Sequence, residues 1–191
     1  PYLSRGLGDV YKRQMKDEIG LEKTQANFVP LTPLSHLQRA AKVFPTSTAV
    51  VYNNHRVNYA EYHARCSQLA SALIDVGVKP GSVVATILPN VPAQAEAHFG
   101  VPACGAVLNT INTRLDVDTV SYIFNHGEAE VVLVDTQFLR LAESACAKVD
   151  GNAPLIIEVP DPSAGFQSSG YITYEQFLSS GDKQFEWLMP Q

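Results

Sequence analysis

The chain has 191 residues, of which 46% are hydrophobic and 17% are charged, a composition typical of a globular protein rather than a disordered one. Its formal net charge is -5 and its 14 lysines and arginines are scattered, which argues against a nucleic-acid-binding surface. No apolar run approaches the ~18 residues that a membrane-spanning helix needs, and no signal-peptide pattern precedes Met15.

The first fourteen residues, PYLSRGLGDVYKRQ, have neither helical nor strand periodicity and are followed by Met15. Part of this stretch, GLGDVYKRQ, is similar to translated adaptor sequence from assembled sequencing data. We therefore expect residues 1–14 to be a non-native, disordered leader and the native chain to begin at Met15.

The next segment predicts a helix followed by a hairpin. Thr32 is expected to cap a helix that has Pro33 at its first position and ends near Phe44, before a second proline. Two short apolar runs, 49–52 and 56–58, then flank the polar sequence NNH, which is a hairpin signal.

A longer helix is predicted from Asn58, as its cap, to about Val76, with Gly77 ending it. Apolar residues recur along it every three or four positions, which indicates one buried stripe. The stripe consists of Tyr62, Cys66, Leu69, Ala70, Leu73 and Ile74.

Strands and helices then alternate, which predicts an α/β fold with a parallel sheet flanked by helices. Open sheets of this kind bind ligands beyond the carboxyl ends of their strands, and the polar loop 110–115 follows such an end. The predicted strands are 83–88, one that starts at 107–108, 131–134 and 155–157. The predicted helices run from Asn90 to about Ala106 with Pro102 inside, from Asp116 or Asp118 to Gly127, and from Thr136 to about Val149, with a short helix at YEQFL.

The chemistry-bearing residues form no catalytic or metal-binding motif. The chain has no GxxxxGK[ST], HExxH or GxSxG sequence, and no GxGxxG follows a strand. The five histidines and the cluster at 168–170 are interpreted as structural, with His126 at a helix C-terminus and the cluster as a turn. The three cysteines are expected to be buried thiols in a reducing compartment: Cys66, Cys104 and Cys146.

Three stretches carry a resemblance to a known family: ANFVPLTPLSHLQRAAKVFP, VNYAEYHARCSQLASALIDVGVKPGSVVATILPN and AHFGVPACGAVLNTINTRLDVDTVSYIFNHGEAEVVLVD. Together they resemble the start of adenylate-forming, AMP-binding acyl-CoA synthetases, and NTINTRL after GAVLN is the most specific part. The likeness is to the branch of short- and medium-chain acyl-CoA synthetases and plant acyl-activating enzymes. It implies that residues 15–191 are the first part of a large N-terminal domain, truncated before the phosphate loop and lacking the C-terminal domain.

The resemblance implies an ATP-dependent acid–thiol ligase in the full-length protein. A carboxylic acid of short or medium chain would form an acyl-adenylate with ATP and Mg2+, and coenzyme A would then displace AMP. The fragment itself would be inactive, and a bacterial protein of this kind would be cytoplasmic. Two other functions are compatible with the sequence: a stand-alone α/β binding module, and adenylation that loads a carrier protein.

Arg114 is the single residue of this chain for which the resemblance implies a site role. In related ligases the arginine of the polar loop after this strand contacts the nucleotide end of coenzyme A. The alternative is that Arg114 caps a carbonyl or pairs with Asp116 or Asp118. No catalytic or metal-binding residue is expected within the chain.

The family architecture also implies that strands covering the helix after Asn58 lie beyond Gln191. The isolated chain is therefore expected to expose Leu69, Leu73 and Ile74 to water, and such an apolar patch favours aggregation.

Deleting residues 1–14 is expected to leave the melting temperature unchanged within error. Ordering residues that have no apolar face costs about 1–2 kcal/mol of backbone entropy per residue with little in return. Thermal unfolding of the complete and shortened chains measures the difference. A drop of more than a few degrees would show that the leader belongs to the fold.

Overall fold

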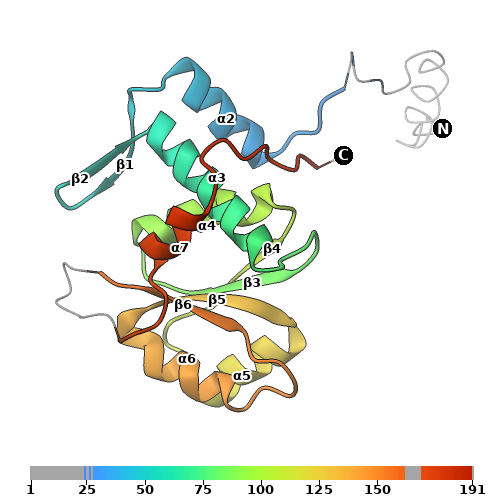
Figure 1. The fold of residues 1–191 in the computed structure, drawn as a ribbon, viewed down its shortest axis with the longest axis vertical. Helices are drawn as coiled ribbons and strands as arrows, with labels where there is room; N and C mark the ends of the chain where they lie inside the picture. Colours follow the sequence, from blue (N-terminus) through green and yellow to red (C-terminus); the bar gives the residue numbers. More distant parts are fainter. Residues whose placement is uncertain (1–23, 25, 27, 162–168, 191) are drawn as a thin grey trace, which may run out of the picture. The chain divides into compact units, whose positions relative to one another are not determined.

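The computed structural model describes residues 24, 26, 28–161 and 169–190. The leader proposed at 1–14 lies outside these residues. The chain divides into two units, Pro1–Leu31 and Thr32–Gln191. In the first unit the Phe28 N–H donates to the Thr24 carbonyl at 2.9 Å. The second unit contains the helices and strands traced in Figure 1.

The second unit opens with a helix and a hairpin, as predicted. Helix α2 (Pro33–Val43) has Pro33 in its first turn, and the Thr32 hydroxyl accepts a hydrogen bond from the Leu34 N–H. Strands β1 (Thr48–Tyr52) and β2 (His55–Asn58) pair antiparallel.

Helix α3 (Tyr59–Asp75) confirms the predicted cap and stop. The Asn58 side chain accepts from the Glu61 N–H at 2.8 Å while the Glu61 carboxylate accepts from the Asn58 N–H at 3.1 Å, forming a capping box. At the other end Gly77 has φ +98°, a conformation that glycine adopts without steric cost.

The predicted parallel sheet is confirmed. It contains β3 (Val83–Ile87), β4 (Val107–Thr110), β5 (Ala129–Asp135) and β6 (Leu155–Val159). The strand order is β4-β3-β5-β6, and every neighbouring pair is parallel.

Two predicted helix caps are each wrong by one residue. Helix α4 (Pro92–Ala103) begins after Val91 and not after Asn90, because Pro92 already supplies a pre-set φ at the first turn. The Asp135 carboxylate, and not Thr136, caps the 3-10 helix η1 (Thr136–Phe138), since it accepts the Gln137 N–H at 3.0 Å. The other helices are α5 (Val117–His126), α6 (Leu139–Cys146) and α7 (Tyr174–Ser180).

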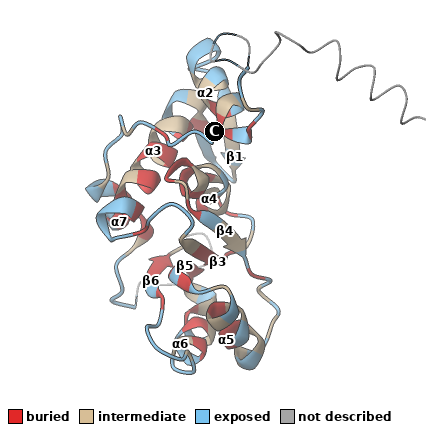
Figure 2. Cartoon of the chain, turned by 90° about the vertical axis from the view of Figure 1, so that its right-hand side faces the viewer, coloured by how far each residue is buried: buried red, intermediate tan, exposed pale blue. Residues whose placement is uncertain are grey.

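The sheet separates two hydrophobic cores, because successive side chains of a strand point to opposite faces. Helices α3, α4 and α7 pack on one face, with α2 lying against α3 and α4, while α5 and α6 pack on the other face (Figures 1 and 2). On β3, for example, Val84 belongs to the first core and Ala85 to the second. Of the cysteines, Cys66 and Cys104 are buried as predicted, Cys146 is half-buried, and all three are free.

The expectation of an exposed stripe on α3 is wrong. Leu69 and Leu73 are fully buried, and only Ile74 is exposed, at 37%. Helix α4 covers the stripe, and its Gly100 allows the close approach: a Cβ there would lie 2.7 Å from Leu69 Cδ2. The C-terminal segment adds a second cover, since the buried Trp187 donates from Nε1 to the Ser67 hydroxyl at 2.8 Å.

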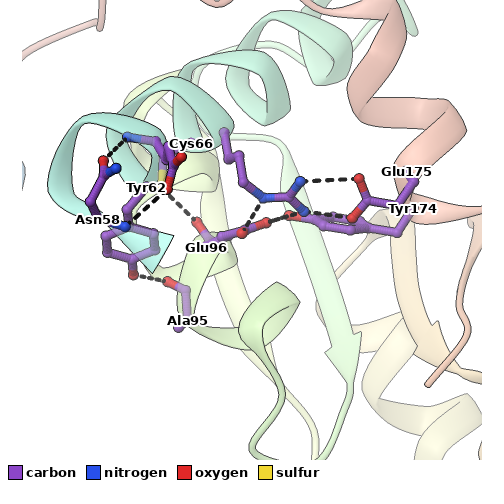
Figure 3. A network of polar contacts seen from close by, with 9 residues as sticks. Asn58, Tyr62, Cys66, Ala95, Glu96, Tyr174 and Glu175 are labelled. Atoms are coloured by element: carbon purple, nitrogen blue, oxygen red, sulfur yellow. Dashed lines mark hydrogen bonds and ion pairs between the residues drawn. The ribbon is translucent and has the colours of Figure 1, made fainter. Parts of the chain in front are cut away.

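A charged network joins α3, α4 and α7 on this face of the sheet (Figure 3). Arg65 of α3 donates from Nε to Glu96 of α4 at 2.5 Å and from Nη2 to Glu175 of α7 at 2.6 Å. The Tyr174 hydroxyl donates to Glu96 at 2.8 Å. Burial raises the pKa of the Glu96 carboxyl, and the hydrogen bonds from Arg65 counter that rise.

Gly181→Ala is expected to lower the free energy of unfolding by about 1–3 kcal/mol, the usual range for overpacking. A Cβ at Gly181 would lie 2.0 Å from the Gln68 carbonyl oxygen, so α7 would have to move away from α3. Urea denaturation measures the change, and Ser180→Ala is the matched control because its hydroxyl bonds only within α7, to Phe177. Equal effects of the two variants would contradict the expected clash.

Candidate functional site

The carboxyl ends of the four parallel strands form the edge where a ligand is expected. From β3 the chain moves outward to β4 and then returns to the other side of β3 to form β5. This reversal creates a topological switch point between the carboxyl ends of β3 and β5, and open α/β sheets bind ligands in the crevice at such points. The candidate site therefore comprises this switch point and the neighbouring loop after β4.

The loop after β4 is anchored to the sheet and carries Arg114. The Ile111 N–H donates to the Thr86 carbonyl of β3 at 2.8 Å, which extends the strand pairing by one residue. A tight turn follows, in which the Leu115 N–H donates to the Asn112 carbonyl at 3.3 Å. Arg114 lies in this turn and is exposed, as the predicted polar loop required.

Arg114 forms no ion pair within the described part of the chain. The two acids considered as its partners are engaged elsewhere. Asp116 caps α5 by accepting the Thr119 N–H at 2.8 Å, and this bond lowers the pKa of Asp116. Asp118 pairs with Lys148 of the segment that follows α6. The guanidinium thus remains available for an anion, while its role stays a prediction.

Asp135 brings a buried carboxyl group to the switch point. The residue ends β5 and is 0% exposed, and its Oδ2 has no hydrogen-bond partner among the described residues. Burial raises the pKa of Asp135, and the nearby Asp161 and Glu158 raise it further. The carboxylate form is therefore held at a free-energy cost at neutral pH.

Glu158 is a second buried acid at this edge, but its oxygens are bonded. It accepts from the Thr136 hydroxyl at 2.7 Å and from both the N–H and the hydroxyl of Ser169 at 3.1 Å. The Ser169 hydroxyl is thus held in a structural bond, in agreement with the turn predicted there; Ser168 lies outside the described residues.

The edge presents the exposed cation Arg114 and the buried acids Asp135 and Glu158. Arg114 can contact an anion, whereas the described residues contain no group of three or more His, Cys, Asp or Glu that could hold a metal ion. Two cavities of about 620 and 550 Å³ lie along the hairpin and α4, and Arg114 lines neither.

Of the described helices, none is long and apolar enough to cross a membrane.

The sequence predicted the exposed position of Arg114 in a polar loop after a strand, but it indicated no role for Asn112 or Asp135. An aspartate directly after the apolar run 131–134 was a usable signal, because it places an acid at the carboxyl end of a buried strand. The role of Asn112 depends on the turn geometry, which its sequence neighbours alone did not reveal.

The sequence profile described as "AMP-binding enzyme" matches residues 37–177, which is most of the chain. The chain belongs to the AMP-binding enzyme family. This match confirms the predicted family resemblance.

Several curated AMP-binding relatives are CoA ligases. The peroxisomal acetate/butyrate–CoA ligase of Arabidopsis thaliana is 41% identical over 187 residues, and the acetate–CoA ligase of Humulus lupulus is 40% identical over 188 residues. Each comparison covers 92% of this chain and 33% of the relative. The chain therefore spans about a third of the length of these relatives.

Solved structures share the AMP-binding fold at lower identity. An anthranilate–CoA ligase in complex with anthranoyl-AMP matches with a TM-score of 0.77 and 21% identity, covering 88% of this chain and 32% of that one. A benzoate–CoA ligase from Burkholderia xenovorans matches with a TM-score of 0.73 and 18% identity, covering 85% and 31%. These likenesses show that the α/β arrangement is that of the family.

Asp135→Asn is expected to raise the melting temperature at neutral pH. Because the folded-state pKa of Asp135 is above its unfolded value, the carboxylate destabilises the fold above that pKa, and the penalty disappears as the pH falls through it. An amide keeps the acceptor for the Gln137 N–H and carries no charge. Thermal unfolding as a function of pH measures the gain, which should shrink under acid conditions.

The matched control is Asp116→Asn, which is expected to lower the melting temperature at neutral pH. Its folded-state pKa is lowered, so its carboxylate stabilises the fold at neutral pH and loses this effect as the pH falls. A lower melting temperature for Asp135→Asn than for the wild type at pH 7 would contradict the expected charge penalty.

Proposed function

We propose that this chain is the N-terminal part of an ATP-dependent acyl-CoA ligase that acts on a short- or medium-chain carboxylic acid. The observation that carries the proposal is the 41% identity to a ligase named for acetate and butyrate. The same identity favours a ligase over a stand-alone binding module. A cytoplasmic location is proposed for a bacterial source.

The proposed reaction has two steps. A carboxylate oxygen attacks the α-phosphorus of ATP, forming the acyl-adenylate and releasing pyrophosphate. The thiolate sulfur of coenzyme A then attacks the acyl carbon, the carbon–sulfur bond forms, and AMP leaves with the electrons of the broken carbon–oxygen bond. Both steps bring polyanionic substrates to the protein, so cationic and N–H donors are needed around them.

Within this reaction the proposed task of the chain is to bind coenzyme A at the carboxyl edge of the sheet. Arg114 supports this proposal because it is exposed, follows a parallel strand next to the switch point, and has no acidic partner among the described residues. A planar guanidinium suits a phosphate oxygen pair better than an ammonium does. Coenzyme A is preferred over a carrier protein as the acceptor because Arg114 offers a site for its nucleotide phosphates.

Magnesium does not fit the residues described here. The buried acids Asp135 and Glu158 do not form a metal-binding group, so no step is assigned to a metal ion at this edge. We propose that ATP and magnesium are held by parts of the ligase outside this chain, and that the chain alone is inactive.

Arg114→Ala, in the longer ligase that carries this chain, is expected to raise the KM for coenzyme A by up to about tenfold. The exposed contact would serve only the second step, so acyl-adenylate formation measured by ATP–pyrophosphate exchange should remain near wild type. Arg114→Lys should recover part of the loss, since it keeps the charge but not the two-pronged geometry.

Arg39→Ala is the matched control, because Arg39 is an exposed arginine on α2. It is expected to change neither half-reaction. If Arg114→Ala lowers both half-reactions together with the melting temperature, Arg114 is a structural residue and its binding role is wrong.

A further inference from the structure

Asn112 organises the turn from which the Arg114 side chain leaves the fold. Its Oδ1 accepts a hydrogen bond from the Arg114 N–H at 3.0 Å. Its own carbonyl accepts from the Leu115 N–H at 3.3 Å. Asparagine at the first position of a turn commonly makes this pair of bonds, in which the side chain imitates a backbone carbonyl.

The turn is fixed at both ends. On one side the Ile111 N–H is bonded to β3, and on the other Asp116 caps α5. Between these two anchors, Asn112 makes the bond that holds the backbone of Arg114. The side chain of Arg114, in contrast, has no ion-pair partner in the described part of the molecule.

We infer that Asn112 is a positioning residue that sets where the Arg114 guanidinium meets the anionic end of coenzyme A. This inference rests on the proposed function. A long side chain loses rotamer freedom when it binds a ligand, and a fixed Cα limits that loss to the side chain itself. Without the Asn112 bond, the backbone at Arg114 would also have to be ordered on binding.

Asn112→Ala in the full-length ligase is expected to raise the KM for coenzyme A by about two- to fivefold, less than Arg114→Ala, with ATP–pyrophosphate exchange unchanged. Asn112→Ser should lie between the wild type and the alanine variant, since a hydroxyl makes the same turn bond more weakly. Asn112→Asp should keep the turn bond and the melting temperature, because its carboxylate accepts the same N–H, but its negative charge beside Arg114 should raise the KM for coenzyme A. This graded series keeps the test usable if the alanine variant is poorly folded.

The double variant Asn112→Ala/Arg114→Ala decides whether the two residues act through one contact. If Asn112 works by positioning Arg114, its substitution should add nothing once the guanidinium is gone. An equal effect of Asn112→Ala in the presence and absence of Arg114 would overturn the inference.

Asn125→Ala provides the matched control. Asn125 of α5 also accepts a backbone N–H through Oδ1, from Asp150 at 2.9 Å, but lies at the other end of the helix. Its substitution is expected to lower the melting temperature about as much as Asn112→Ala while leaving the KM for coenzyme A unchanged.

The outcomes separate the two proposals. If Arg114→Ala leaves the KM for coenzyme A unchanged, the proposed binding role fails, and the inference on Asn112 fails with it. If Arg114→Ala has the expected effect but Asn112→Ala has none, only the inference on Asn112 is overturned. The same holds if Asn112→Ala lowers both half-reactions in parallel, because a turn residue with a purely structural role would do so.

Discussion

The packing of this chain depends on a carboxylate in a place that water does not reach. Glu96 is only 1% exposed, so α4 can pack against α3 only with compensating donors beside it. Arg65 supplies two of them, through Nε and Nη2, and the Tyr174 hydroxyl supplies a third. Removing one partner of a buried ion pair destabilises a protein more than replacing both partners does. The buried Glu96 carboxylate therefore links the three helices through its contacts with Arg65 and Tyr174.

This interaction reaches the candidate site through the short segment that precedes α7 and bridges to β6. With α7 held by Arg65, the Ile172 carbonyl accepts the Glu158 N–H at 3.0 Å along the outer edge of β6. Ser169 then bonds the Glu158 carboxylate, which lies beside Asp135 in the same acidic group. At the carboxyl edge of the sheet, the acids Asp135 and Glu158 are thus buried and held by the fold, while Arg114 is exposed.

Local chemistry made much of the fold predictable. Thr32, Asn58 and Gly77 act at helix ends through bonds to their immediate neighbours, and the apolar runs of β3 and β5 carry the signal of a sheet covered on both faces. For the same reason the position of Arg114 after a parallel strand could be anticipated from residues close to it.

The failures at the α3 stripe and at Asp135 depended on contacts between residues far apart in the sequence. The stripe at Leu69 and Leu73 was expected to be exposed because the strands covering it were placed beyond Gln191. Nothing near it in the sequence shows that Gly100 lets α4 approach so closely. Likewise, the burial of Asp135 is set by β6 and the residues after it. The caps at Asn90 and Thr136 failed because a neighbour, Pro92 or Asp135, competed for the same helix start.

The Arg65 network also has a consequence for synthesis on the ribosome. Arg65 is 31 residues from Glu96 but 110 residues from Glu175. At about 5–20 residues per second, Glu175 is made about 6–22 s after Arg65, long after helix formation is complete. Arg65 and Glu96 can therefore pair first and bring α3 and α4 together, so that the nascent chain already presents a charged docking point when α7 emerges.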